Sequence, residues 1–128
     1  EYAIPVEHVV DVLREARSIL ERGRHRVSFP VEVRFAPADD VWLSTAYGRE
    51  TAYVAVHVYQ GTPHEAYFAD MEALFTSVGG RPHWGKKHTR DRSYLESVYP
   101  MLGEAMAVRE RVDPGRRFTN AYLDRVLG

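Results

Sequence analysis

The chain has 128 residues, 45% of them hydrophobic and 27% charged, and its formal net charge is −1. This length suits one domain with one core, and the near-zero charge excludes strong bulk attraction to nucleic acid or to an anionic membrane. The absence of cysteine excludes disulfides, thiolate metal sites and a thiol nucleophile. No apolar run approaches the roughly 20 residues that a membrane-spanning helix needs.

The first part of the chain predicts one helix and two or three strands. Residues 1–4 can form a short strand, and apolar residues with a 3.6-residue period predict a helix over 5–22. Strict alternation of side chains predicts strands at 31–35 and 51–60, both rich in β-branched and aromatic residues. Between them, residues 41–45 fit either a short strand or an irregular segment.

The second part predicts a helix, a last strand and further helices. Residues 62–65 read as a capping box, and the apolar spacing after them predicts a helix over 67–78. A strand is expected over 81–84, followed by a helix near 101–112 in which Val112 faces inward. This order suits an α+β, ferredoxin-like split βαβ sandwich, with an antiparallel sheet, helices on one face and extra C-terminal helices.

The alternation in the strands has a consequence for chemistry. If the apolar residues lie under the helices, Glu32 and Arg34 project from the opposite face of the sheet. Ring-bearing side chains would share that face: Tyr53, His57 and Tyr59. Residues 81–86 combine a cation, an imidazole and an indole around a glycine, and this segment could border the same face.

A plain structural explanation competes with a binding site here. A Glu-x-Arg pair on a strand is commonly a solvated ion pair worth at most ~1 kcal/mol. Exposed aromatic side chains on the same face favour a binding surface instead, and an interface with another domain is as good an explanation as a ligand site. No metal site is expected, because His83 and His88 are not spaced like helical zinc ligands.

Three motifs occur in order along the chain: Glu32-Val33-Arg34, His83-Trp84-Gly85-Lys86, and an ending from Asp113-Pro114 to Leu127-Gly128. Together they resemble the substrate-binding domain of aldonolactone and alditol oxidases, which are flavoenzymes of the vanillyl-alcohol-oxidase type. Within that family the chain most resembles bacterial D-arabinono- and L-gulono-1,4-lactone oxidases or dehydrogenases. The chain departs from the pattern where the glycine after Asp113-Pro114 comes one position early.

The resemblance implies that residues 1–128 form a single domain, the C-terminal substrate-binding part of a larger FAD-dependent oxidoreductase. Its substrate would be a sugar-derived lactone or an alditol, oxidised by hydride transfer to the flavin. The sequence has no Gly-rich phosphate loop, and the family's FAD-binding domain is missing from it. The isolated chain is therefore expected to hold FAD weakly and to be inactive.

The resemblance also implies roles for individual side chains. Arg34 would stabilise the charge that reduced flavin gains, and Glu32 would orient substrate hydroxyls. Lys86 would hydrogen-bond the reacting hydroxyl or ring oxygen, and His57 would line the pocket or accept the hydroxyl proton. The expected catalytic residues are thus Glu32, Arg34 and Lys86. Substrate would be bound by His57, Tyr59, His83 and Trp84, and the cofactor would lie near Arg34, Asn120 and Tyr122.

The expected partners are the enzyme's own N-terminal FAD-binding domain and a small sugar-derived substrate, with no nucleic acid. A cytoplasmic location is expected, and peripheral attachment to a membrane stays open. Two hypotheses without catalysis compete with this one. The chain would then be a free-standing ferredoxin-like domain that recognises a small acid or a protein, or else a structural domain that oligomerises.

Overall fold

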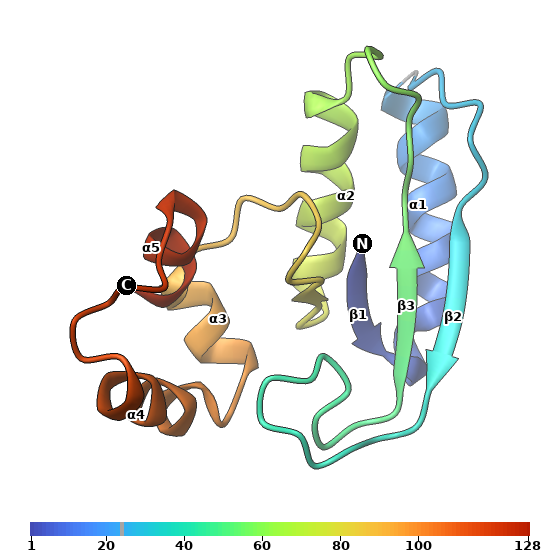
Figure 1. Ribbon diagram of the computed structural model, residues 1–128. Helices are drawn as coiled ribbons and strands as arrows, with labels where there is room; N and C mark the ends of the chain where they lie inside the picture. Colours follow the sequence, from blue (N-terminus) through green and yellow to red (C-terminus); the bar gives the residue numbers. More distant parts are fainter. Residues whose placement is uncertain (24) are drawn as a thin grey trace.

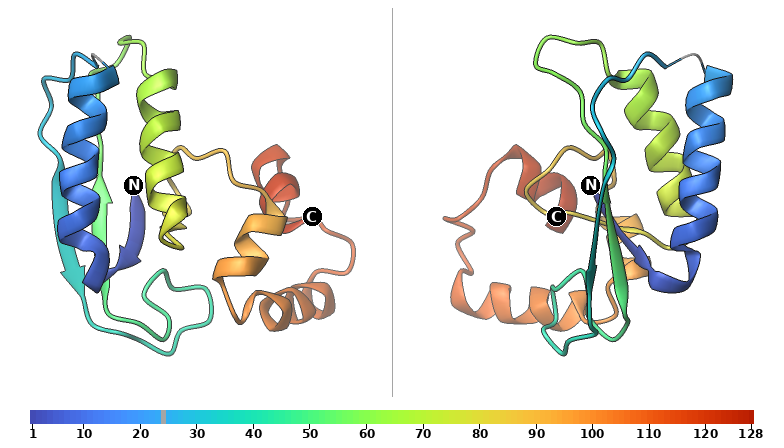
Figure 2. Two further views of the ribbon diagram at one scale, coloured as in Figure 1. Left: turned by 180° about the vertical axis from the view of Figure 1, so that it is seen from behind. Right: turned by 90° about the vertical axis from the view of Figure 1, so that its right-hand side faces the viewer.

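An antiparallel sheet with two helices on one face forms the centre of the molecule (Figure 1 and Figure 2). The computed structural model describes residues 1–23 and 25–128. The main elements are β1 (Tyr2–Pro5), α1 (Val9–Gly23), β2 (Glu32–Ala36), β3 (Thr51–Ala55), α2 (Glu65–Ser77) and β4 (Arg81–Pro82). The strand order is β2-β3-β1-β4, which confirms the predicted ferredoxin-like split βαβ sandwich.

The first helix begins in a different way from the helix expected over 5–22. Its first turn is a 3-10 turn, η1 (Val6–His8), and α1 continues to Gly23. Val12 and Ala16 lie one helical turn apart and are buried in the core against the sheet. Ala16 belongs to the apolar period predicted for this helix, whereas Val10, which also belongs to that period, is 54% exposed.

Strand β3 is shorter than the alternation predicted. We expected a strand over 51–60, but β3 ends at Ala55. The reason lies in its neighbours: β2 pairs with β3 only as far as Glu32 opposite Ala55, and β1 only as far as Tyr2 opposite Val54. Beyond Ala55, no described strand residue lies opposite, so alternation alone cannot extend the sheet.

The start of α2 corrects the predicted capping box. Residue His64 occupies the N-cap without a capping side-chain hydrogen bond, and the helix begins at Glu65. Thr62 is instead part of a turn in which its N–H donates to the carbonyl of Tyr59 at 3.0 Å. The expected last strand over 81–84 is also shorter, because β4 contains only Arg81–Pro82.

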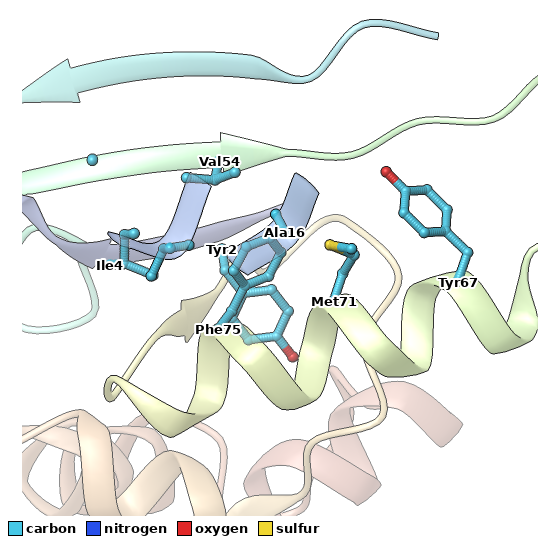
Figure 3. Packing of buried hydrophobic residues seen from close by; sticks show 9 residues of the cluster. Tyr2, Ile4, Ala16, Val54, Tyr67, Met71 and Phe75 are labelled. Carbon is cyan, nitrogen blue, oxygen red and sulfur yellow. The ribbon is translucent and has the colours of Figure 1, made fainter. Parts of the chain in front are cut away.

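The main core lies between the sheet and the two helices. Ile4 and Val54 point from the sheet toward α2, where Met71 and Phe75 meet them (Figure 3). The rings of Tyr2 and Phe75 lie with centroids 5.5 Å apart. Each of these side chains contributes roughly 1.5–3 kcal/mol by leaving water, and this core holds β1 and β3 in register.

A second, smaller core lies beyond the β4 edge of the sheet (Figure 1). It is built by α3 (Arg92–Val98), α4 (Leu102–Val112) and α5 (Ala121–Leu127), which confirm the expected extra C-terminal helices. Its buried residues are Leu95, Tyr99, Leu102 and Val126. Val112 was expected to face inward, but it is 71% exposed because it lies at the end of α4, outside this cluster.

The connection between β2 and β3 is irregular, which settles the alternative left open for residues 41–45. Buried Arg81 fastens it: the guanidinium donates to the carbonyls of Tyr47 at 2.8 Å and Thr45 at 3.2 Å. The same side chain donates to the carbonyl of Val98 at 2.7 Å. Arg81 therefore links β4, this connection and the end of α3. None of the helices in the described part of the chain is long and apolar enough to cross a membrane.

Candidate functional site

Strands β2 and β3 carry polar side chains on the sheet face opposite α1 and α2. Arg34 lies opposite Tyr53 and Glu32 opposite Ala55, and directly opposed residues of antiparallel strands share a face. The apolar pair between them, Val33 opposite Val54, turns toward the helices. The register thus places Glu32 and Arg34 away from the helical layer, as the alternation predicts.

A buried carboxylate joins two cations at this face. The Glu1 side chain is 1% exposed, and its Oε2 accepts hydrogen bonds from Arg34 Nη2 at 2.8 Å and from Lys86 Nζ at 2.7 Å. The His83 N–H donates to the Glu1 carbonyl at 3.0 Å, and the Lys86 N–H to the His83 carbonyl at 3.1 Å. These backbone bonds bring the segment after β4 next to the start of β1.

Glu1 is absent from the residues that sequence reasoning selected, although a signal for it was available. Tyr2 and Ile4 are core residues of β1. Because side chains alternate along a strand, Glu1 and Ala3 must face the other way, toward the polar side. A carboxylate at that position is a natural partner for cations on neighbouring strands.

Two opposing effects act on the Glu1 carboxyl. Burial alone would raise its pKa, but the hydrogen bond and charge of Lys86 and the charge of Arg34 outweigh burial, so the pKa lies below its usual value. Glu1 is therefore ionised at neutral pH. The group of Glu1, Arg34 and Lys86 carries one negative and two positive charges.

Glu32 completes the polar face from the other side of Arg34. Its Oε1 lies 3.2 Å from Arg34 Nε, and its Oε2 lies 3.7 Å from His57 Nε2. The Arg34 guanidinium also lies over the Tyr53 ring, 5.9 Å from the centroid. The side chains of Glu32, Arg34 and Lys86 are 49%, 52% and 40% exposed, so a ligand can reach all three.

The alternation predicted that strand geometry would place Tyr59 on this face. The structure does not support that placement, because β3 ends at Ala55. Its side chain is 62% exposed and its ring lies 5.2 Å from that of Phe29. The Phe29 ring also lies 5.1 Å from the His57 imidazole. His57 thus connects Glu32 to a small aromatic group, and substrate binding by Tyr59 stays a prediction.

His83 and Trp84 have local partners. His83 Nδ1 accepts from the Gly85 N–H at 3.0 Å. The Trp84 indole N–H donates to the Leu43 carbonyl at 2.9 Å, and its ring lies 5.0 Å from that of Tyr99. Trp84 therefore packs against the second core, which explains its presence without a ligand, and its expected part in a pocket wall stays a prediction.

Asn120 and Tyr122 lie at the start of α5. The Asn120 side chain caps this helix by accepting from the Leu123 N–H at 2.9 Å. The Tyr122 hydroxyl donates to the Trp84 carbonyl at 2.7 Å and lies 3.0 Å from His88 Nε2. Tyr122 thus connects α5 to the segment after β4, and contact of either residue with a cofactor stays a prediction.

A cavity of about 710 Å³ lies between α2, the ends of β1 and β3, the segment after β4 and α5. Polar residues of the site, Glu1, His57 and Lys86, line it together with His88. Burial and the charge of Arg125 lower the pKa of His88 to about 4, so this imidazole is neutral at pH 7. The apolar wall includes Phe68, Met71 and Phe75.

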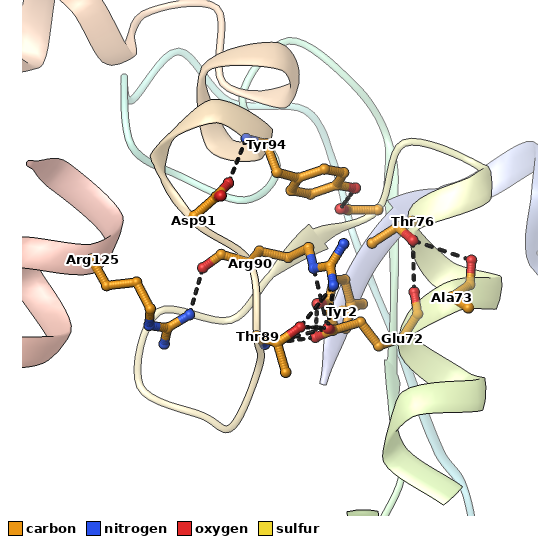
Figure 4. A network of polar contacts seen from close by, with 10 residues as sticks. Tyr2, Glu72, Ala73, Thr76, Thr89, Arg90, Asp91, Tyr94 and Arg125 are labelled. Carbon is orange, nitrogen blue, oxygen red and sulfur yellow. Dashed lines mark hydrogen bonds and ion pairs between the residues drawn. The ribbon is translucent and has the colours of Figure 1, made fainter. Parts of the chain in front are cut away.

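A second buried carboxylate holds the segment 83–91 against α2 (Figure 4). Glu72 accepts hydrogen bonds from the Tyr2 hydroxyl at 2.5 Å, the Thr89 N–H at 2.9 Å and Arg90 Nε at 3.1 Å. The Thr89 hydroxyl donates to the same carboxylate. This network fixes the far end of the segment that carries Lys86.

Comparison with known proteins identifies the class. The sequence profile described as D-arabinono-1,4-lactone oxidase matches residues 1–126. The chain is 46% identical over 128 residues to L-gulono-1,4-lactone dehydrogenase of Mycobacterium tuberculosis, covering 100% of this chain and 30% of that protein. It is 37% identical over 132 residues to L-gulonolactone oxidase of Bos taurus, covering 99% and 30%. For alditol oxidase of a Streptomyces species, it is 34% identical over 134 residues, covering 99% and 31%.

The chain therefore belongs to the D-arabinono-1,4-lactone oxidase family. This confirms the resemblance inferred from the three sequence motifs. The chain spans about 30% of the length of these relatives. The family consists of oxidoreductases that are named for lactones and alditols.

Proposed function

We propose that this chain is the substrate-binding part of an FAD-dependent oxidoreductase that oxidises a sugar-derived lactone or an alditol. The observation that carries this proposal is the convergence of Arg34, Lys86 and Glu32 on one sheet face, with both cations held by a buried carboxylate. The names of the relatives, lactone oxidases, a lactone dehydrogenase and an alditol oxidase, support the substrate class.

The donor set fits a flavin and a polyhydroxylated substrate. Arg34 offers a rigid guanidinium that is 52% exposed, and such a group suits the negative charge that a flavin gains on reduction. The adjoining cavity combines an apolar wall with a few polar groups, which is typical of small-molecule sites. When bound, FAD would supply the two-electron oxidant that takes a hydride from the substrate carbon.

The side chains of this chain would orient the substrate and manage its proton. Lys86 Nζ donates hydrogen bonds to the reacting hydroxyl or ring oxygen, and Glu32 accepts hydrogen bonds from neighbouring hydroxyls. His57 Nε2, which lies 3.7 Å from Glu32 Oε2, would accept the proton of the reacting hydroxyl. Arg34 holds its positive charge where negative charge develops.

The test uses the longer protein that carries this chain. We expect it to show the absorption spectrum of a flavin, bleached by an aldono-1,4-lactone or an alditol. Arg34→Ala should slow flavin reduction by about 10²–10³-fold, because losing one preorganised charge-stabilising donor has this effect in other enzymes. Stopped-flow absorbance measures the rate.

Arg14→Ala is the matched control, since Arg14 lies on α1 and pairs only with exposed Asp11 at 3.2 Å among the described ion pairs. Its rate of flavin reduction should equal that of the unmodified protein. An unchanged rate in Arg34→Ala would remove the proposed role of this residue, and a longer protein that binds no flavin would contradict the proposed function as a whole.

A further inference from the structure

The carboxylate of Glu1 is far more buried than the two cations that it contacts. Its side chain is 1% exposed, whereas those of Arg34 and Lys86 are 52% and 40% exposed. Burying a carboxylate is unfavourable unless charged partners and hydrogen bonds compensate for the lost hydration. Here the compensation comes from the two cations of the proposed site. Both cations are therefore held next to the Glu1 carboxylate.

The geometry of this contact determines how far apart the two cations lie. Arg34 Nη2 and Lys86 Nζ contact the same oxygen, Glu1 Oε2, at 2.8 and 2.7 Å. The two nitrogens therefore cannot be farther apart than the sum of these distances. Glu1 itself is held by the backbone, because its carbonyl accepts from the His83 N–H at 3.0 Å.

Glu32 does not duplicate this role. It contacts Arg34 Nε at 3.2 Å on the side of His57. Among the described ion pairs, the carboxylate partner of Lys86 is Glu1. Without the Glu1 charge, Lys86 would lose its anchor and the face would carry one more uncompensated positive charge.

We propose that Glu1 is a positioning residue that sets the separation of Arg34 and Lys86 and balances one of their two charges. The positioning part depends only on the contacts within this chain. The charge-balancing part rests on the proposed function, since it concerns the potential felt by a bound flavin. The two parts are therefore tested separately.

The positioning part is tested by competitive acylation of amines, which needs no flavin. Lys86 and Lys87 are the two lysines of the chain, so Lys87, which contacts His64 at 2.9 Å, is an internal reference. With limiting reagent and fragment-ion mass spectrometry, Glu1→Gln should raise the ratio of Lys86 to Lys87 labelling roughly three- to tenfold, because Lys86 loses a partly exposed charged hydrogen bond. An unchanged ratio overturns the positioning role.

Two control variants separate a direct contact from general loosening, with circular dichroism to verify the fold. Glu96→Gln removes a carboxylate that pairs with Arg92 on α3 at 2.7 Å, and it should leave the labelling ratio unchanged. Glu72→Gln weakens the anchor of the same segment at Thr89 without touching Lys86. If the ratio rises as much in Glu72→Gln as in Glu1→Gln, the specific role of Glu1 is wrong.

The charge-balancing part is tested by spectroelectrochemistry of the longer flavin-loaded protein. Glu1→Gln should move the flavin reduction potential to a more positive value, because the site gains net positive charge, whereas Arg34→Gln should move it to a more negative value. Shifts of the same sign, or no shift in Glu1→Gln, overturn charge balancing. A longer protein without flavin overturns the proposed function and charge balancing with it, while the labelling result still decides the positioning role.

Discussion

Glu72 is the residue on which the position of the segment 83–91 depends most directly. Burial would raise the pKa of its carboxyl, but hydrogen bonds from Thr89 and Tyr2 and the charge of Arg90 bring the pKa below its ordinary value. The folded protein therefore binds a proton at Glu72 less readily than the unfolded chain does. This difference stabilises the fold above the unfolded-state pKa, and the stabilisation is lost as the pH falls through the folded-state pKa.

Glu72→Gln should lower the free energy of unfolding at pH 7 by about 2–4 kcal/mol, because it breaks a buried, hydrogen-bonded charge network. The difference between the variant and the unmodified chain should shrink as the pH falls below about 4.3, the ordinary value for Glu. Urea unfolding at pH 7 and at several acidic pH values measures both. A difference that stays constant with pH would show that the Glu72 charge is not what stabilises the network.

The end of α2 shows how one element controls the next. Gly79 has a positive φ of 68°, which L-residues with a side chain rarely adopt. A Cβ on Gly80 would lie 2.5 Å from the carbonyl oxygen of Phe75. By contrast, a Cβ on Gly103 in α4 would meet nothing within 4 Å. The turn into β4 therefore requires glycine at positions 79 and 80. The surroundings of Gly103 leave room for a side chain.

Alanine substitutions at Gly80 and Gly103 should change the free energy of unfolding in opposite directions. Gly80→Ala should destabilise the fold by about 1–3 kcal/mol, because the backbone of α2 must shift to make room. Gly103→Ala should raise the free energy of unfolding by roughly 0.5–1 kcal/mol, because alanine loses less entropy in a helix. Thermal unfolding followed by circular dichroism gives both values, and a destabilising Gly103→Ala would contradict the open surroundings of that residue.

The existence and order of the elements of the sandwich could be predicted from sequence, but their ends could not. Periodicity depends on which side chains are buried, and it correctly placed Ala16 and Val54 in the core. The end of a strand depends on where its neighbours stop, which explains why the prediction extended β3 past Ala55. The helix start at Glu65 was also missed, because a turn uses Thr62. For the site, alternation placed Glu32 on the right face.

What sequence could not show for the site is the contact between distant segments. Glu1 and Lys86 are 85 positions apart, and nothing local to either predicts their meeting. Trp84 was expected to form a pocket wall because it lies in an unusual motif, and that role stays a prediction; the sequence did not show that its ring also packs against Tyr99 of the second core. A motif shows which residues are neighbours in the sequence. The direction in which each side chain points depends on tertiary packing.

A buried cation, Arg81, links the sheet to the C-terminal helices. Arg81 is 5% exposed and donates to three carbonyls, on the β2–β3 connection and at the end of α3. Its guanidinium also lies 5.3 Å from the centroid of the Tyr99 ring. The sheet and the C-terminal helices should therefore unfold together.

Arg81→Met should lower the free energy of unfolding by about 2–4 kcal/mol, because it leaves buried carbonyls without donors. Hydrogen exchange should speed up more in α3 and α4 than in α1, since the second core loses one of its links to the sheet. Arg14→Met, on the exposed surface of α1, should stay within about 0.5 kcal/mol of the unmodified chain. Equal acceleration of exchange in α1 and α3 would contradict this coupling role.

The contact between Glu1, Arg34 and Lys86 also has a consequence for how the chain folds. The carboxylate comes from the first residue described and one of its cations from a position 85 residues later. Contacts of such long sequence separation slow folding, because the loop between them must be closed first. The complete cluster therefore requires that β1, β2 and the segment after β4 have all come together, so a chain with an incomplete sheet lacks at least one of its charges.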